Sequence, residues 1–208
     1  EHPTQLADLL VALREPRRMA GRRAVVLTDG GGHGAVAADA LVAAGLETPV
    51  LTGSTATELA ATLWAQATVS NPVDLAGAGE QDMDSYARGV EVLLGSDQVD
   101  GVLLTGYFGG YSAEGSGLAA AEVEAARRIA AVVTGQAKPL VVQTLAPGGP
   151  AGRVLSEAGI PVHRDVDRAC AVLAGLVVRS SAGLAEELPA PAPPATDTTY
   201  AGARELFT

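Results

Sequence analysis

Cysteines and long apolar runs are what this sequence lacks most clearly. Cys170 is the only cysteine in 208 residues, so neither a disulfide framework nor a thiolate metal cluster can form within one chain. Its small apolar neighbours indicate a buried residue rather than a nucleophile. No apolar run reaches the ~18 residues that a membrane-spanning helix needs, and the N-terminus lacks the pattern of a signal peptide. These absences predict a protein of the reducing cytoplasm with no membrane partner.

Basic and aromatic residues are also few. Lys and Arg number 14 against 24 Asp and Glu, which gives a net charge of −10. Five arginines lie between Arg14 and Arg23, where we interpret them as the solvated flank of a helix end and linker. The charge therefore disfavours a nucleic-acid surface. Only 3% of residues are aromatic although 48% are hydrophobic, and this excess of Ala, Val and Leu suits close packing of helices on a sheet.

Strand-like and helix-like segments alternate along the chain, joined by loops of a few residues. The predicted strands are 23–28, 47–51, 99–105, 139–145 and 160–163. The predicted helices are 4–13, 34–44, 55–63, 82–94, about 117–133, 150–158, 166–178 and 197–207. Such alternation is typical of an open parallel sheet with helices on both faces. The predicted fold is an α/β, flavodoxin-like three-layer sandwich with a mostly parallel five-stranded sheet.

Composition changes along the chain predict four segments. Residues 1–20 form an N-terminal helix and linker, and residues 21–182 form the α/β domain. Residues 183–196 form a Pro/Ala linker, which should be extended and semi-rigid. Residues 197–208 are predicted to begin a following module. The reason is that a lone helix after a linker has no neighbouring element in this chain with which it could form a domain.

A glycine cluster follows the first buried strand. Residues 29–34 read D-G-G-G-H-G and lead directly into a helix rich in small residues. Glycines leave backbone N–H groups uncovered, and the helix dipole adds partial positive charge, so Gly30, Gly31 and Gly32 can hold an anion such as phosphate. The spacing matches neither G-x-x-x-x-G-K-[ST] nor G-x-G-x-x-G. The alternative is a tight turn whose glycines only permit close packing.

Other glycine-rich loops follow other strands, at 106–112 and 146–149. In a parallel sheet the carboxyl ends of the strands meet at one edge, where ligands bind. Asn71 and Asp74 are expected at the same edge; the alternative is that Asn71-Pro72 begins a turn which Asp74 caps, without chemistry. No pair of carboxylates is spaced for general acid–base work, and no His/Cys/Asp cluster indicates a metal site.

Five windows of the sequence together resemble the nucleoside-diphosphate-forming acyl-CoA synthetases, which include ADP-forming acetate–CoA ligases and, more distantly, succinyl-CoA synthetase. These windows are 29–39, 71–75, 99–104, 138–142 and 159–162. The resemblance covers about residues 20–180 and is to one CoA-ligase domain, equivalent to the carboxy-terminal part of the succinyl-CoA synthetase β subunit. It implies that residues 21–182 are this CoA-ligase domain and that residues 197–208 approach an ATP-grasp-like module.

The resemblance also implies roles for the glycine loops. In the family, helix N-termini from two domains hold the phosphate of a phosphohistidine, and Asp29 with its glycines corresponds to one such helix start. Gly109, Gly110, Tyr111 and Ser112 resemble the other substrate-contacting loop, where Ser112 could donate a hydrogen bond to a carboxylate or phosphate. The family's phosphorylated histidine lies in a different motif on the partner domain, so we interpret His33 as a helix-start residue without a covalent role.

This sequence departs from the family at Asp29, where an Asn is common. A carboxylate facing a phosphate would repel it unless it were protonated or turned aside. This departure disfavours direct contact between the Asp29 side chain and phosphate, whereas donation by the backbone N–H groups is not affected.

The function implied by the resemblance is a share in the reversible reaction acyl-CoA + ADP + phosphate to acid + CoA + ATP. CoA, ATP or ADP and Mg would serve the full-length enzyme, with none assigned to this chain alone. The chain alone should be inactive and should work with CoA-binding, phosphohistidine and ATP-grasp domains or subunits; a homodimer is compatible with such an incomplete module.

Two alternatives stay open. The first is a non-catalytic module that binds acyl-CoA or an anion, or that docks other domains. The second is a true flavodoxin, although few rings are available to stack on a flavin. The acyl substrate is not specified by the sequence.

Overall fold

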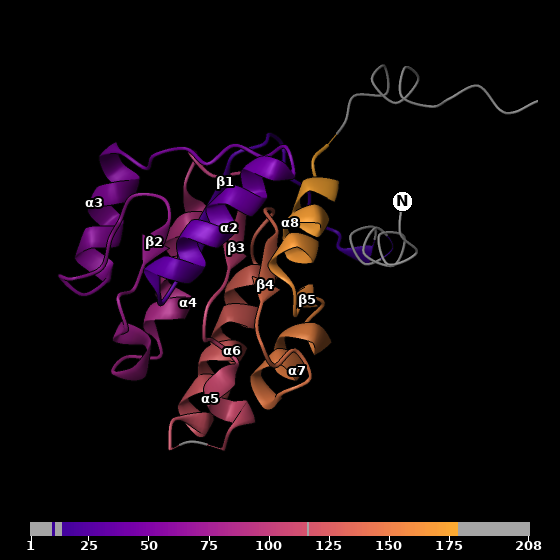
Figure 1. Cartoon of the computed structure of the whole chain (residues 1–208). Helices are drawn as coiled ribbons and strands as arrows, with labels where there is room; N and C mark the ends of the chain where they lie inside the picture. Colours follow the sequence, from indigo (N-terminus) through magenta and orange to yellow (C-terminus); the bar gives the residue numbers. More distant parts are fainter. Residues whose placement is uncertain (1–9, 11–13, 116, 179–208) are drawn as a thin grey trace, which may run out of the picture. The chain divides into compact units, whose positions relative to one another are not determined.

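The sheet has five parallel strands in the order β2–β1–β3–β4–β5 (Figure 1). The computed structural model describes residues 10, 14–115 and 117–178. Its strands are β1 (Ala24–Thr28), β2 (Val73–Asp74), β3 (Gly101–Leu104), β4 (Leu140–Gln143) and β5 (Val162–His163). This is a flavodoxin-like arrangement, so the predicted fold class is confirmed.

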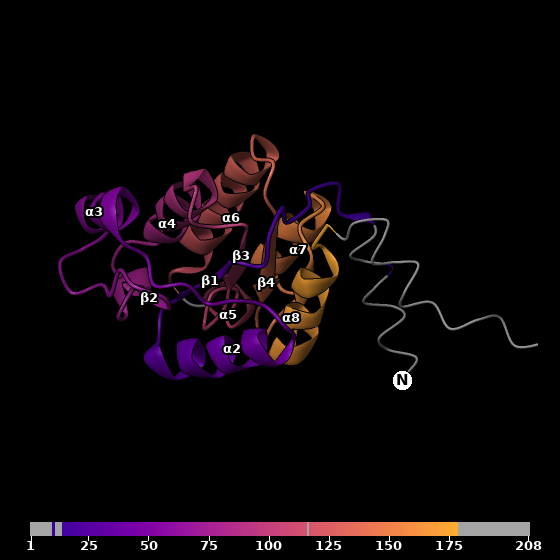
Figure 2. The ribbon, with the colours of Figure 1, turned by 90° about the horizontal axis from the view of Figure 1, so that it is seen from above.

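Helices cover both faces of the sheet (Figure 2). They are α2 (Gly31–Ala43), α3 (Gly53–Thr62), α4 (Ser85–Gly95), α5 (Gly110–Ala113), α6 (Ala119–Thr134), α7 (Pro150–Glu157) and α8 (Val166–Gly175), with a 3₁₀ turn, η1 (Ala78–Glu80). Helices α2 and α8 pack together on one face; α4, α6 and α7 lie on the other, with α3 against α4. None of these described helices is long and apolar enough to cross a membrane.

Successive side chains of a strand point to opposite faces of the sheet, and this alternation explains why the core has two layers. In β1, Val25 and Leu27 face the core beneath α4 and α6, whereas Ala24 and Val26 face the core beneath α2 and α8. All five residues of β1 are fully or almost fully buried. Strands buried on both faces read as continuous apolar runs, which is why β1, β3 and β4 were predictable from sequence.

The predicted strand at 47–51 is wrong. Within it, only Glu47 pairs with the sheet, through an isolated bridge to Arg23. The second strand is instead β2, whose Val73 and Asp74 pair with the end of β1. Two paired residues are too few to give a periodic pattern, so the sequence favoured the longer apolar run.

Asn71 extends the pairing beside β1 with its side chain. Its amide nitrogen donates to the Ala24 carbonyl at 3.0 Å, and its amide oxygen accepts from the Val26 N–H at 3.0 Å. The Asn71 carboxamide therefore makes the hydrogen bonds to the part of the β1 edge that β2 is too short to reach.

The described core reaches back into the segment predicted as a linker. Met19 is fully buried and pairs with Val177 just after α8. The predicted helix at 4–13 lies outside the described residues except for Leu10, and the Pro/Ala linker and terminal helix lie outside them from residue 179 onward.

A glycine at position 34 is required by the close approach of α2 to the strand ends. A Cβ at Gly34 would lie 3.0 Å from Thr28 Cγ2 and 3.1 Å from Pro72 Cβ, whereas a Cβ at Gly32 would meet no atom within 4 Å. We expect Gly34→Leu to lower the free energy of unfolding in urea by about 1–3 kcal/mol. Gly32→Ala is the control and should not destabilise, because Ala is preferred to Gly in helices by about 1 kcal/mol. Equal stability of Gly34→Leu and wild type would contradict this packing.

Candidate functional site

The loops predicted to converge lie together at the carboxyl edge of the sheet. Strand β1 has β2 on one side and β3 on the other. Helix α2 after β1 and helix α6 after β3 lie on opposite faces of the sheet, which opens a crevice between these two strands. The Asp29 carboxylate accepts from the Tyr107 N–H after β3, and the Asp29 carbonyl accepts from the Gly77 N–H after β2. The start of α7, which follows the loop after β4, joins them, since the Ala151 N–H donates to Ser112 Oγ.

The first turn of α2 is uncapped. Gly30, the N-cap residue, has extended backbone and no side chain to accept a hydrogen bond. Among the described residues, none accepts from the N–H groups of Gly31, Gly32 or His33, and all three residues are exposed. Helix α2 has 13 residues, so its dipole reinforces these donors. The turn is chemically suited to a phosphate or carboxylate.

The Asp29 side chain is turned away from this turn. Its Oδ2 accepts from the Tyr86 hydroxyl at 2.6 Å, and its Oδ1 accepts from the Tyr107 N–H at 3.0 Å. Burial, and then the negative charge of Asp29, raise the pKa of Tyr86 far above its usual range, so Tyr86 keeps its proton and remains a donor. The sequence left open whether this carboxylate faces a bound phosphate, and the structure directs it inward.

The second glycine loop is held by a residue that sequence reasoning missed. Glu122 on α6 is fully buried, and its carboxylate accepts from the Gly109 N–H at 2.5 Å and the Ser112 N–H at 2.6 Å. The Gly110 N–H donates to the Tyr107 carbonyl. These three donors, predicted to contact substrate, are therefore engaged within the protein. A Glu ten to thirteen residues after a glycine loop gives no recognisable pattern, because the contact depends on how α6 packs.

Two tyrosines form one wall beside the start of α2. The rings of Tyr107 and Tyr111 meet edge to face with centroids 4.7 Å apart, and the Tyr111 hydroxyl donates to Glu80 at 3.2 Å. They line a cavity of about 430 Å³ together with Asp29, Gly30, His33, Gly77, Glu80 and Glu114. Burial, and then the charge of Glu80, raise the pKa of Tyr111 above its usual range. The three carboxylates make this side of α2 unfavourable for an anion.

A second cavity opens on the other side of the same turn. It has a volume of about 520 Å³ and is lined by Gly32, His33, Val36, Thr105, Gln143, Arg164, Asp165, Val166 and Asp167. Two of the side chains that line it are held by hydrogen bonds. Thr105 donates to the Gln143 amide oxygen at 2.5 Å, and the Gln143 amide nitrogen donates to the Arg164 carbonyl. Because Arg164 adds a cation, this cavity is less negative than the tyrosine side. His33 lines both cavities.

Asn71 and Asp74 both contact neighbouring backbone. Both polar atoms of Asn71 are bonded to β1, as described above. Asp74 Oδ1 accepts from the Ala76 N–H at 2.8 Å, and its Oδ2 lies 3.4 Å from the position of a Cβ on Gly31. Asp74 therefore caps the turn after β2, and its negative charge lies close to the first turn of α2.

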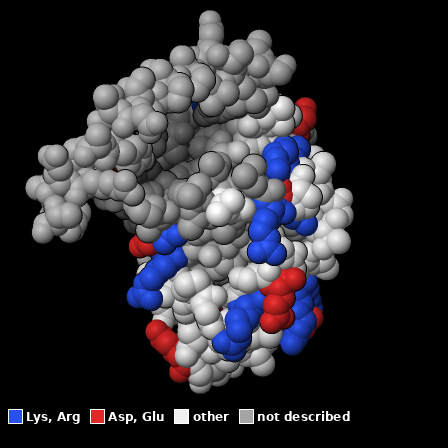
Figure 3. Space-filling view, turned by 90° about the vertical axis from the view of Figure 1, so that its right-hand side faces the viewer, with Lys and Arg blue, Asp and Glu red and all other residues white. Residues whose placement is uncertain are grey.

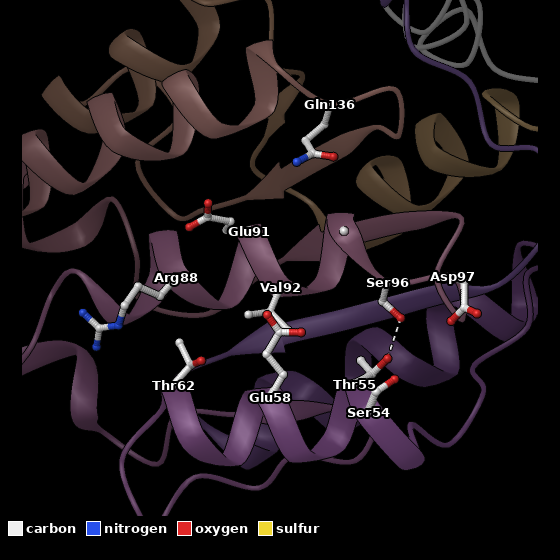
Figure 4. A pocket seen from close by; sticks show the side chains of 11 residues that line it. Ser54, Thr55, Glu58, Thr62, Arg88, Glu91, Val92, Ser96, Asp97 and Gln136 are labelled. Carbon is white, nitrogen blue, oxygen red and sulfur yellow. Dashed lines mark hydrogen bonds between the residues drawn. The ribbon is translucent and has the colours of Figure 1, made fainter.

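Where Figure 3 shows described residues, seen from the β5 side, the charged side chains form no continuous basic surface. There, basic groups stand apart from one another with acidic groups among them (Figure 3). A further groove of about 710 Å³ runs between α3 and α4 (Figure 4). It is lined by Glu58, Glu91 and Asp97, and the guanidinium of Arg88 at its end is paired with Asp82 and Asp84. This groove also disfavours an anion. The candidate site is the start of α2, where N–H groups have no acceptor among the described residues.

Comparisons with known proteins agree with the fold. No protein-family model matches the sequence, and a search of curated proteins finds no match. Among solved structures, the protein PH0766 from Pyrococcus horikoshii OT3 matches with a TM-score of 0.69 and 24% identity, covering 85% of this chain and 39% of that one.

The second similar structure is an acetyl-coenzyme A synthetase. The dinucleotide-forming acetyl-coenzyme A synthetase 1 of Ca. Korarchaeum cryptofilum matches with a TM-score of 0.70 and 21% identity, covering 85% of this chain and 37% of that one. The same values hold for its complex with phosphate and ADP. This chain thus has the fold of one part of a larger synthetase and spans less than two-fifths of each of these chains.

Removing the Asp29 carboxylate should destabilise the site. Asp29→Ala leaves the buried Tyr86 hydroxyl without its acceptor, so we expect the free energy of unfolding to fall by about 1–3 kcal/mol in urea. Asp29→Asn keeps an acceptor for the Tyr107 N–H and should lose less. Asp39→Ala, at an exposed position of α2, is the matched control. If Asp29→Ala were no less stable than this control, the inward hydrogen bonds would not hold the site together.

Cys170 should be inert, as its neighbours in sequence predicted. It is fully buried, and burial raises the pKa of its thiol to about 12. We expect that the folded protein does not react with a disulfide reagent at pH 8. After denaturation, one thiol per chain should react with it. Rapid reaction of the folded protein would show that the packing of α8 against α2 does not bury Cys170.

Proposed function

We propose that this chain is the CoA-ligase domain of a nucleoside-diphosphate-forming acyl-CoA synthetase, and that the first turn of α2 holds a phosphoryl group. The observation that carries the proposal is that the N–H groups of Gly31, Gly32 and His33, at the strand-end crevice, have no acceptor in the described part of the chain. Its support is the fold shared with one part of an acetyl-coenzyme A synthetase whose structure is also known with phosphate and ADP.

The chain's own residues would bind and orient the phosphoryl group. The three N–H groups donate to its oxygens, and the dipole of α2 offsets its negative charge. Asp29 would stay out of contact, held by Tyr86 and Tyr107. The phosphoryl group would enter from the side of Arg164, because the tyrosine side carries three carboxylates.

Other parts of the enzyme would supply the rest of the reaction. Among the described residues, no group of three or more His, Cys, Asp or Glu is placed to hold a metal ion. Following the family resemblance, we assign Mg²⁺, the nucleotide and the phosphorylated histidine to other domains or subunits, with which this chain would form a complete site.

A charge placed in the first turn tests the phosphate site. Gly32 has open space for a side chain, so Gly32→Asp should fold, and its carboxylate at the helix N-terminus should add about 0.3–1 kcal/mol of stability. The same charge should weaken binding of inorganic phosphate, measured by calorimetry, by about tenfold or more.

Gly32→Ala is the matched control and should bind phosphate as wild type does. Failure of wild type to bind phosphate, or equal binding by Gly32→Asp and Gly32→Ala, would contradict the proposal.

A docking module is the second candidate, favoured by the outer face of α2. Val36 and Val42 there are 59% and 57% exposed. A helix that is apolar on both faces usually has a partner. If the chain binds none of phosphate, CoA and short acyl phosphates, a docking module is the better supported of the two functions.

A further inference from the structure

Two carboxylates, the buried Glu122 and the half-buried Asp29, hold the loop between β3 and α6 from opposite ends. At one end, Glu122 accepts from the N–H groups of Gly109 and Ser112. At the other end, the Tyr107 N–H donates to Asp29. The loop therefore couples a residue on α6 to the residue that precedes the N-cap of α2.

The loop has little room to move between these anchors. Gly109 has φ +98°, which a side chain rarely adopts, and a Cβ there would lie 2.4 Å from Thr144 Oγ1 at the end of β4. A Cβ on Gly106 would lie 2.2 Å from Asp29 Oδ1. The loop is thus packed against both neighbouring strand ends, and the bonds to Glu122 fix its remaining side.

Asp29 is well placed to compete with a bound anion if the loop shifts. Asp is among the side chains that cap helix N-termini by accepting from backbone N–H groups. Asp29 lies one residue before Gly30, and the N–H groups of the first turn have no partner among the described residues. What keeps its carboxylate away is the pair of bonds from Tyr86 and Tyr107.

We propose that Glu122 is a positioning residue for the anion site: by fixing the loop, it keeps the Tyr107 N–H on Asp29 and so leaves the first turn of α2 open. The identity of the anion rests on the proposed function, whereas the coupling from Glu122 to Asp29 does not. Glu122 itself does not touch the ligand.

The test compares phosphate affinity among matched variants. Glu122→Gln puts an amide group against two N–H donors, so it should release the loop and weaken phosphate binding by about tenfold, as is common when a supporting group is removed. Glu124→Gln removes the same charge from an exposed position on the same helix and should bind as wild type does. The double variant Asp29→Asn with Glu122→Gln should regain the affinity of Asp29→Asn, because the competing charge is gone.

A purely structural role for Glu122 would not produce that rescue. Folded Glu122→Gln with wild-type phosphate affinity, or a double variant as weak as Glu122→Gln, would overturn the proposal. If Glu122→Gln does not fold, amide hydrogen exchange of the wild type decides: strong protection of Gly109 and Ser112 supports the clamp, and exchange as fast as in exposed loops refutes it.

The two proposals fail in different ways. If wild type binds no phosphate, the proposed function falls. The coupling is then read from the NMR signals of the Tyr107 N–H and the Tyr111 ring. They should shift in Glu122→Gln but not in Glu124→Gln, and unchanged signals in both would overturn it.

Discussion

The inward bonds of the Asp29 carboxylate are the constraint on which the site depends. Asp29 lies between β1 and the N-cap residue Gly30, so its carboxylate could turn toward the first turn of α2 and place a negative charge where we propose that an anion binds. Tyr86 on α4 and the Tyr107 N–H after β3 hold the carboxylate instead, and burial keeps Tyr86 protonated. The same bonds join the ends of β1 and β3 to helix α4, so the stability of the crevice and the openness of the helix terminus have one cause.

Small residues make this arrangement possible. Gly34 lets α2 approach β1 and Pro72, and Gly106 leaves room for the Asp29 carboxylate beside β3. The core beneath α2 and α8 is likewise built largely of Ala, Val and Leu. The scarcity of aromatic residues in the sequence therefore reflects close packing of helices on the sheet, and two of the four tyrosines, Tyr107 and Tyr111, stand as a pair at the wall of the site.

Structural features that depend on a local sequence pattern could be predicted from the sequence, whereas features that depend on tertiary packing could not. Strands β1, β3 and β4 are continuous apolar runs, and the convergence of their glycine loops follows from parallel pairing. Strand β2 could not be predicted because it has only two paired residues, and the Asn71 side chain makes the other hydrogen bonds to this edge of β1. Glu122 escaped it because a buried carboxylate on a long helix is recognisable only once its two N–H partners are seen.

The central claim is that the first turn of α2, and not the second glycine loop, holds the anion. An NMR titration of the wild-type chain with inorganic phosphate tests it most directly. The account predicts that the amide signals of Gly31, Gly32 and His33 shift with phosphate while those of Gly109 and Ser112 stay in place. Shifts confined to Gly109 and Ser112, or no shift at α2, would contradict it.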